Sequence, residues 1–246
     1  MSEKTLKSLS NLRKDLIDRA VNYGCGLTES QADLLISHAG MILEGNRDMR
    51  LTGFKNMEEI ISGLVLDSLA CVPAIPEGPV KIIDLGTGAG IPGIPVKILR
   101  PEVPVVLLES RRKAADFLRS VINKLGLYGI EVVNGRAEDI ACDAGMRERF
   151  DIALARALAP LPVLLEIALP YLRAGGILLA QKGPKAPEEL DQSKNALEVL
   201  EGKVVGDRIY RAEGKSGDYH ILVIEKTGST AEKYPRRAGI PWKKPL

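Results

Sequence analysis

The first 75 residues show the hydrophobic spacing of helices. Apolar residues recur every three or four positions over residues 6–21, which predicts an amphipathic helix. Thr28 and Gln31 resemble a capping box ahead of the apolar run ADLLISHAGMIL, so they predict the start of a second helix. A third helix is expected over residues 57–72. We therefore expect a small helical N-terminal segment over residues 1–75.

Short apolar strands alternate with helices from about residue 80 onward. The five strand-like runs are KIIDLG, VPVVLLES, IEVVNG, FDIALAR and GGILLAQKG. Such alternation is typical of a parallel sheet with helices on both faces. Two further runs, KVVGDRIYRAE and DYHILVIEKT, are separated only by turn residues and predict an antiparallel hairpin.

The pattern as a whole predicts an α/β protein with a doubly wound, Rossmann-like sheet of seven strands. The antiparallel terminal hairpin forms one edge of this sheet, and the helical segment precedes it. Residues 76–230 are expected to form the ligand-binding domain. Residues 231–246 are expected to form a basic C-terminal tail, because KYPRRAGIPWKKPL holds five basic residues, three prolines and no acidic residue.

Composition and charge narrow the class of protein. The chain of 246 residues is 45% hydrophobic and 27% charged, which is enough apolar material for a sizeable core. Its net charge of +2 does not by itself indicate a nucleic-acid partner. The three cysteines lie far apart, which argues against a disulfide scaffold and a zinc site, so no metal is expected. No apolar run reaches about 18 residues and the N-terminus lacks a secretory pattern, so we expect a cytoplasmic protein without a membrane partner.

The segment DLGTGAGIPG, residues 84–93, carries the main candidate chemistry. It follows an apolar strand and opens a helix, so its glycines permit a sharp turn and a close approach of a ligand to the main chain. Glu109 lies 25 residues after Asp84, at the end of the next strand. A carboxylate at that place commonly accepts hydrogen bonds from ribose hydroxyls.

Two ligands compete for this loop, and a tight turn without a ligand is a third interpretation. Gly88, Gly90 and Gly93 fit the GxGxxG dinucleotide pattern, which alone is a weak signal. Asp84 favours S-adenosylmethionine instead, because a carboxylate there opposes a pyrophosphate but suits the amino-acid or sulfonium end of that ligand. The terminal hairpin points the same way, since methyltransferase sheets usually end in one.

Several short motifs occur in the order found in one known family. They are LDSL at 66–69, DLGTGAGIPGIP at 84–95, LLES at 107–110, GRAE at 135–138, ARA at 155–157, KG at 182–183 and YPRRAG at 234–239. This ordered set resembles the bacterial small-subunit ribosomal RNA guanine-N7 methyltransferases, also called glucose-inhibited division protein B. The resemblance runs from about residue 40 to the C-terminus. Arg50 and Leu64 depart from the family pattern, which often has Asn and His at those places.

The resemblance implies a class I methyltransferase fold that binds S-adenosylmethionine and methylates N7 of one guanine in 16S ribosomal RNA. It implies that Glu109 holds the ribose and that Ala137 and Glu138 lie at the adenine. Arg156, at the end of the fourth strand, would face both the cofactor and the target base. The full set of expected cofactor-binding residues is Asp84, Gly86, Thr87, Gly88, Gly90, Ile91, Glu109, Ser110, Ala137, Glu138 and Arg156.

Methylation at N7 places few chemical demands on the protein. Guanine N7 has a free in-plane lone pair, so the reaction needs no general base, only alignment with the methyl group at near-attack distance. The sequence agrees, because it lacks the Asn-Pro-Pro-Tyr/Phe tetrapeptide usual for exocyclic amines and the Pro-Cys nucleophile of pyrimidine C5 methylation. The candidate catalytic residue is Arg156, whose guanidinium would donate to guanine O6 or to a phosphate. A salt bridge to Asp84 or Glu138 is its alternative role.

Basic residues give the candidate RNA contacts. Arg136 is expected to position the RNA backbone and Lys182 to contact a phosphate, with a solvated arginine and a plain surface loop as the alternatives. The tail predicts further phosphate contacts in a flexible segment, unless it is only a solvated basic tail. Phe54, Tyr219 and Trp242 are too dispersed along the chain to predict a base-stacking platform. The basic side chains of the tail are Arg236, Arg237, Lys243 and Lys244.

The leading hypothesis is a monomeric S-adenosylmethionine-dependent methyltransferase acting on small-subunit ribosomal RNA or on the 30S particle. A small-molecule methyltransferase is disfavoured by Arg156 and by the basic tail, since a small substrate usually needs an enclosed apolar lid. A dinucleotide-dependent oxidoreductase is disfavoured by Asp84 and the terminal hairpin. A non-catalytic RNA-binding or cell-division factor is disfavoured by the intact glycine loop and Glu109.

Overall fold

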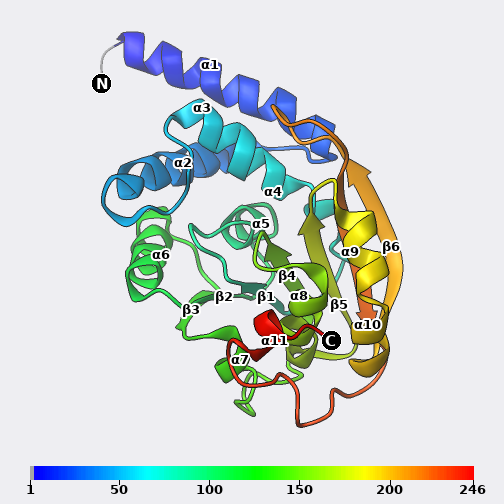
Figure 1. Ribbon diagram of the computed structural model, residues 1–246. Helices are drawn as coiled ribbons and strands as arrows, with labels where there is room; N and C mark the ends of the chain where they lie inside the picture. The colour runs from blue at the N-terminus through cyan, green and yellow to red at the C-terminus, as the bar shows by residue number, and fades with distance from the viewer. Residues whose placement is uncertain (1–2) are drawn as a thin grey trace.

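Seven strands form one mixed sheet in the computed structural model, which describes residues 3–246 and the side chains of residues 9–246 (Figure 1). The strand order is β3-β2-β1-β4-β5-β7-β6. Strands β1 to β5 are parallel, and β7 runs antiparallel to both β5 and β6. The predicted α/β sheet with a terminal hairpin is therefore confirmed. The strands are β1 (Ile82–Leu85), β2 (Val105–Glu109), β3 (Ile130–Asn134), β4 (Phe150–Arg156), β5 (Leu172–Lys182), β6 (Gly202–Tyr210) and β7 (Tyr219–Lys226).

Strand β1 shows why the parallel strands are almost entirely apolar. All four of its residues are buried, and Ile82 and Ile83 belong to the hydrophobic cores on opposite faces of the sheet. A strand that is covered on both faces has no solvent side, so polar and apolar residues do not alternate along it. The edge strand β3, by contrast, is at least partly exposed at every residue.

Helices cover both faces of this sheet. The α-helices are α1 (Glu3–Ala20), α2 (Glu29–Met49), α3 (Met57–Ile60), α4 (Asp67–Leu69), α5 (Gly93–Leu99), α6 (Arg112–Leu125), α7 (Ala137–Ile140), α8 (Leu161–Ala168), α9 (Ala186–Gln192), α10 (Lys194–Val199) and α11 (Ile240–Lys243). Further helical segments are η1 (Val21–Tyr23), η2 (Ile61–Leu66), η3 (Val72–Ala74) and η4 (Leu169–Tyr171). Residues of α2, α5 and α6 pack into the core on one face, whereas residues of α8, α9 and α10 pack into the core on the other. Over residues 3–246, none of the helices combines the length and the hydropathy that a membrane span requires.

The N-terminal helices begin as the sequence predicts but contain one irregular stretch. Thr28 accepts a hydrogen bond from the Gln31 amide and the Gln31 side chain accepts one from the Thr28 amide, so α2 starts with a complete capping box. The predicted third helix differs from a regular helix, because its centre, η2, is π-helical. Gly63 in η2 packs against the Phe54 ring, which a side chain at this position would overlap. Single π-helical turns within α-helices are frequent at functional sites.

The N-terminal helices and the sheet share one hydrophobic core. Leu16 of α1, Leu35 of α2 and Leu66 of η2 are buried in the same cluster as Leu107 of β2. Figure 1 shows α1, in blue, lying over α2, and α1 contacts both α2 and η2. Near residue 75 the chain therefore changes from helices to strands, but the residues on both sides of this point pack into the same core.

The C-terminal residues pack against the sheet domain, and the prediction of a flexible tail is wrong. The red segment that contains α11 lies beside α8 in Figure 1. Arg236 forms an ion pair with Glu166 of α8, whose side chain is fully buried. Arg147 donates a 2.8 Å hydrogen bond to the Tyr234 carbonyl oxygen. A buried carboxylate is costly without a partner, so the Arg236 guanidinium fixes the tail on α8.

Candidate cofactor and substrate site

The predicted site residues gather at the carboxyl ends of the parallel strands. The loop of residues 86–93 follows β1, Glu109 ends β2 and Arg156 ends β4. Strand β1 lies between β2 and β4, so the connections from β1 and β4 leave in different directions. Ligands of open α/β sheets bind in the crevice at such a switch point.

Three glycines shape the loop after β1. Gly86, Gly88 and Gly90 all have positive φ, a conformation that residues with side chains rarely adopt. A Cβ atom at Gly88 would have no neighbour closer than the Gly86 oxygen at 4.0 Å, so the space beside this residue is open. The loop therefore fits a ligand that approaches the main chain closely.

Asp84 supports this loop from within the sheet. Its Oδ2 accepts a 2.5 Å hydrogen bond from the Thr87 hydroxyl and a 2.8 Å hydrogen bond from the Gly93 amide. The carboxyl is fully buried, and no group of the described residues donates to its Oδ1. Burial raises the pKa of Asp84 to about 7, although the hydrogen bonds from Thr87 and Gly93 act to lower it. The side chain positions the loop, and its direct contact with a cofactor stays a prediction.

Glu109 connects the end of β2 to the same loop. Its Oε2 accepts a 2.9 Å hydrogen bond from the Gly88 amide, and its Oε1 accepts a 2.7 Å hydrogen bond from the Arg111 amide. Arg111 Nε also donates to Oε1, at 3.4 Å. An ionised carboxylate has about four acceptor positions, so these three donors leave capacity for a further one. The site therefore fits a ligand with hydroxyl groups, as the ribose prediction requires.

A cavity of about 150 Å³ adjoins the glycine loop and α7. We call it the loop cavity. The predicted RNA contact Arg136 lines it and is exposed. Thr87, Gly88, Gly90 and Ile91 of the loop do not line this cavity, and neither does Glu109. The predicted cofactor residues that line it are Gly86, Ser110, Ala137 and Glu138.

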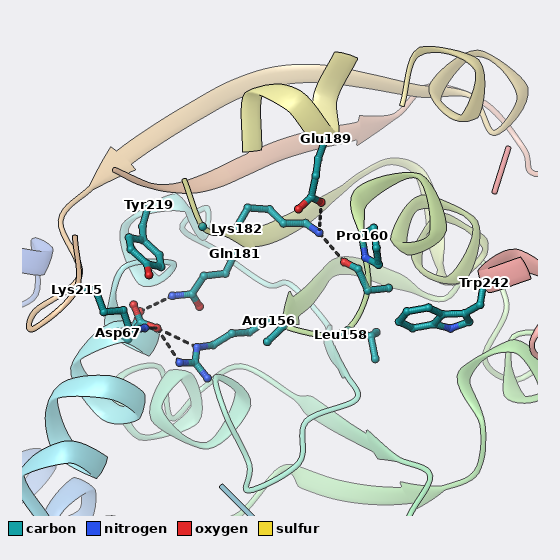
Figure 2. A pocket seen from close by; sticks show the side chains of 13 residues that line it. Asp67, Arg156, Leu158, Pro160, Gln181, Lys182, Glu189, Lys215, Tyr219 and Trp242 are labelled. Atoms are coloured by element: carbon teal, nitrogen blue, oxygen red, sulfur yellow. Dashed lines mark hydrogen bonds and ion pairs between the residues drawn. The ribbon is translucent and has the colours of Figure 1, made fainter. Parts of the chain in front are cut away.

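A larger cavity of about 410 Å³ lies beside Arg156 (Figure 2). We call it the arginine cavity. Arg156 pairs with neither Asp84 nor Glu138. Its Nε and Nη2 lie 3.0 and 2.8 Å from Asp67 Oδ2, and Nη2 also donates to the Gly63 carbonyl oxygen at 2.6 Å. The guanidinium is thus held towards η2 and α4, while its Nη1 makes no hydrogen bond to a described residue.

Asp67 is the centre of a buried polar network that sequence reasoning missed. Its carboxylate also accepts hydrogen bonds from the Tyr210 hydroxyl at 2.8 Å and from Lys215 Nζ at 3.3 Å. Gln181 donates to the Asp67 carbonyl oxygen at 2.8 Å, and its own buried Oε1 has no partner among the described residues. The LDSL motif contained the signal, but the motif alone does not reveal which partner the carboxylate has.

Lys182 lines the arginine cavity and is not the plain surface residue of the alternative interpretation. Its side chain is 8% exposed, and its Nζ lies 2.8 Å from Glu189 Oε2 and 2.6 Å from the Ala159 carbonyl oxygen. Burial lowers the pKa of Lys182, and the ion pair with Glu189 partly offsets this effect. A phosphate would have to share the ammonium group with Glu189.

The remaining basic candidates divide into one anchor and a set of exposed side chains. Arg236 is the anchor, because its guanidinium is bound to Glu166. Among the described side chains, those of residues 9–246, no group of three or more His, Cys, Asp or Glu residues is arranged to hold a metal ion. The exposed basic candidates are Arg136, Arg237, Lys243 and Lys244.

Two aromatic residues from distant parts of the chain line the arginine cavity. Tyr219 of β7 and Trp242 of α11 lie at opposite ends of it in Figure 2. Leu158 and Trp242 also line the loop cavity, so the two cavities share a wall. Dispersion along the chain was therefore a poor reason to dismiss these aromatic side chains, because the folded tail returns Trp242 to the carboxyl ends of the strands.

The sheet order and the loop after β1 define a class I methyltransferase fold. Solved structures share it: a putative transferase, PH0793, from Pyrococcus horikoshii has a TM-score of 0.55 at 14% identity, over 67% of this chain and 64% of that chain. A point mutant of the protein MtNAS has a TM-score of 0.52 at 16% identity, over 92% of this chain and 78% of that chain. At such identities the likeness shows the fold alone.

The sequence comparisons identify the family. The model of the GidB family, rRNA small subunit methyltransferase G, matches residues 31–212. The ribosomal RNA small subunit methyltransferase G of Acetivibrio thermocellus is 43% identical over 246 residues, which cover 100% of both chains. The protein of the same name from Desulfitobacterium hafniense is 44% identical over 220 residues, which cover 89% of this chain and 91% of the relative. The chain therefore belongs to the rRNA small subunit methyltransferase G family, and the resemblance in the sequence is confirmed.

Proposed function

We propose that this protein transfers a methyl group from S-adenosylmethionine to N7 of a guanine in small-subunit 16S ribosomal RNA. The observation that carries the proposal is the wall shared by the loop cavity and the arginine cavity, to which Leu158 contributes. A cofactor in the first cavity and a base in the second would be direct neighbours, as transfer between them requires. Membership of the rRNA small subunit methyltransferase G family supports ribosomal RNA as the substrate.

The residues around the glycine loop fit S-adenosylmethionine. Glu109 would accept a hydrogen bond from a ribose hydroxyl with its remaining acceptor position. Ala137 and Glu138 would border the adenine, because both line the loop cavity from α7. Asp84 would keep the loop in shape through Thr87 and Gly93. The bound cofactor would supply an electrophilic methyl group carried on a sulfonium.

Arg156 would orient the target base and would not activate it. The lone pair of guanine N7 is free at neutral pH, so no residue has to remove a proton from the base. Three hydrogen bonds to Asp67 and Gly63 already hold the guanidinium, so little side-chain freedom is lost when a substrate binds. Its unused donors suit guanine O6 or a nearby phosphate, which leaves N7 free for attack.

The proposed substrate is ribosomal RNA within the small-subunit particle, and the proposed state is a cytoplasmic monomer. A net charge of +2 is small for an enzyme that binds naked RNA by charge alone, which favours a particle whose proteins share the contact. The division into a helical segment to residue 75, a transferase domain to residue 230 and a basic tail belongs to the same proposal. The proposed phosphate contacts are Arg136, Lys182, Arg237, Lys243 and Lys244.

Transfer of labelled methyl groups from S-adenosylmethionine tests this proposal. The substrates are small subunits from cells that lack the endogenous enzyme, with large subunits and naked 16S RNA as matched controls. We expect label in small-subunit RNA and none in the large subunit. Transfer to small molecules instead, or tight binding of a nicotinamide dinucleotide in place of S-adenosylmethionine, would refute it. Cofactor binding without transfer to any ribosomal substrate would favour a non-catalytic protein.

A further inference from the structure

Trp242 occupies an unusual place for a half-exposed aromatic side chain. It is the only tryptophan of the chain, and it is 50% exposed. Single exposed apolar side chains are common and need no explanation. Trp242, however, lines both the loop cavity and the arginine cavity, so ligands in the two cavities would share this residue as a neighbour.

Hydrogen bonds hold the backbone of the turn that carries this tryptophan. The Arg236 guanidinium binds the buried Glu166 of α8 and also donates a 2.8 Å hydrogen bond to the Lys244 carbonyl oxygen. Arg236 precedes α11 and Lys244 follows it, so these contacts hold the chain on both sides of α11 against α8. The Gly239 amide donates to Glu138 Oε1 at 3.3 Å, which joins the turn to the loop cavity. Because the turn is already ordered, placing a ligand against the Trp242 ring does not require the chain around it to be ordered first.

We propose that Trp242 is the surface on which the target guanine stacks; this inference rests on the proposed function and deepens it. The arginine cavity has the larger volume, about 410 Å³ against about 150 Å³, and it opens beside Arg156. Enzymes that modify a base take it out of its stack and hold it against aromatic or apolar side chains. Trp242 and Leu158 form that wall at the junction with the loop cavity, as Figure 2 shows for the side of the arginine cavity.

The electron balance of N7 methylation gives the indole a second role. The S–CH3 bond breaks and its electron pair stays on sulfur, while the N7 lone pair forms the new N7–CH3 bond. No proton is lost, so the positive charge of the sulfonium moves onto the purine ring. Trp has the most favourable face for a cation among the aromatic residues. Trp242 therefore stabilises the methylated, cationic base more than the neutral base.

The single tryptophan makes a direct test possible without any turnover. The full-length protein is first saturated with S-adenosylhomocysteine and then titrated with guanosine 5′-monophosphate or with its cationic 7-methyl form, while the Trp242 emission is followed. We expect both nucleotides to quench the emission, and the 7-methyl form to do so at about 10-fold lower concentration. Emission that responds to S-adenosylhomocysteine but to neither nucleotide would place Trp242 at the cofactor only and overturn the proposal. Quenching at equal concentrations of the two nucleotides would support stacking of the base on Trp242 but overturn the charge-stabilising role of the indole.

Variants then separate stacking from a merely structural role. Trp242→Leu should lower kcat/KM for small subunits by about 10-fold, the size expected for one lost stacking contact. Trp242→Phe keeps an aromatic face and should recover part of this loss. Ile240→Ala is the matched control, because Ile240 is an exposed apolar residue of the same α11 turn outside both cavities. Unchanged kcat/KM in Trp242→Leu would contradict the stacking proposal. A wild-type protein that methylates no ribosomal substrate would instead refute the proposed function, and the fluorescence titration would then decide the stacking proposal by itself.

Discussion

Arg156 and Asp67 form one unit at the edge of the arginine cavity. The carboxylate of Asp67 also receives the Tyr210 hydroxyl and the Lys215 ammonium group, so it keeps partners when the guanidinium is removed. We therefore expect Arg156→Ala to fold. Because the guanidinium points towards Asp67, the variant should also bind S-adenosylmethionine with nearly the wild-type affinity.

The same substitution should lower turnover strongly. Loss of one preorganised donor at a reacting centre typically costs about 100-fold in kcat. The measurement compares single-turnover methylation with cofactor affinity from calorimetry. Arg173→Ala is the control. Arg173 lies near the amino end of β5, whereas the site lies at the carboxyl ends of the strands, and it forms an ion pair with Asp151 at the surface. An Arg156→Ala protein that retains most of its activity would show that the role assigned to this residue is wrong.

Asp84 makes a pH-dependent contribution to stability. Burial raises its pKa from 3.8 to about 7, so between these two values the folded protein keeps a proton that the unfolded chain releases. Asp84 therefore costs stability as the pH rises through this window. Asp84→Asn removes the titration while its side-chain oxygen still accepts from Thr87 and Gly93. The melting temperature of the variant relative to wild type should rise from pH 5 to pH 8. A difference in melting temperature between the variant and wild type that stays constant with pH would refute the titration of Asp84 in this range.

The tail element carries two neighbouring arginines with different roles. Arg236 pairs with the buried Glu166, whereas Arg237 is exposed. Removing one member of a buried pair leaves an uncompensated charge, so Arg236→Ala should lower the free energy of unfolding by about 3 kcal/mol. Arg237→Ala, the matched control, should change it by less than about 0.5 kcal/mol. Denaturant titration of the two variants is the measurement, and equal stabilities would contradict the anchoring role of Arg236.

The elements of the sheet were predictable, because strands buried on both faces appear in the sequence as continuous apolar runs. Three features were not predicted from the sequence. The π-helical η2, whose Gly63 packs against the Phe54 ring, has no pattern in the sequence that distinguishes it from a regular helix. The pair of Asp67 and Arg156 joins residues 89 positions apart. The docked tail did leave a signal: Glu166 is the only charged residue in the apolar helix LPVLLEIA, and a buried charge requires a partner.

At the scale of the whole molecule, the exposed basic side chains near the two cavities determine how binding depends on salt. Affinity for small subunits should fall with ionic strength, since each phosphate contact releases counterions. Each exposed contact replaced by Gln should reduce the slope of log affinity against log salt by about 1. The residues to replace are Arg237, Lys243 and Lys244. Filter binding over a salt series measures this slope. An unchanged slope in the triple variant would mean that the tail does not contact RNA.

The one-core arrangement brings the glycine loop, Arg156 and the docked tail together around one reaction, the methylation of guanine N7. The most direct test is to incubate the protein with labelled S-adenosylmethionine and small subunits from cells that lack this methylation, and then to map the label in the digested RNA. The account predicts label in 7-methylguanosine at a single position of 16S ribosomal RNA. Label in any other nucleoside, or at many positions, would contradict it.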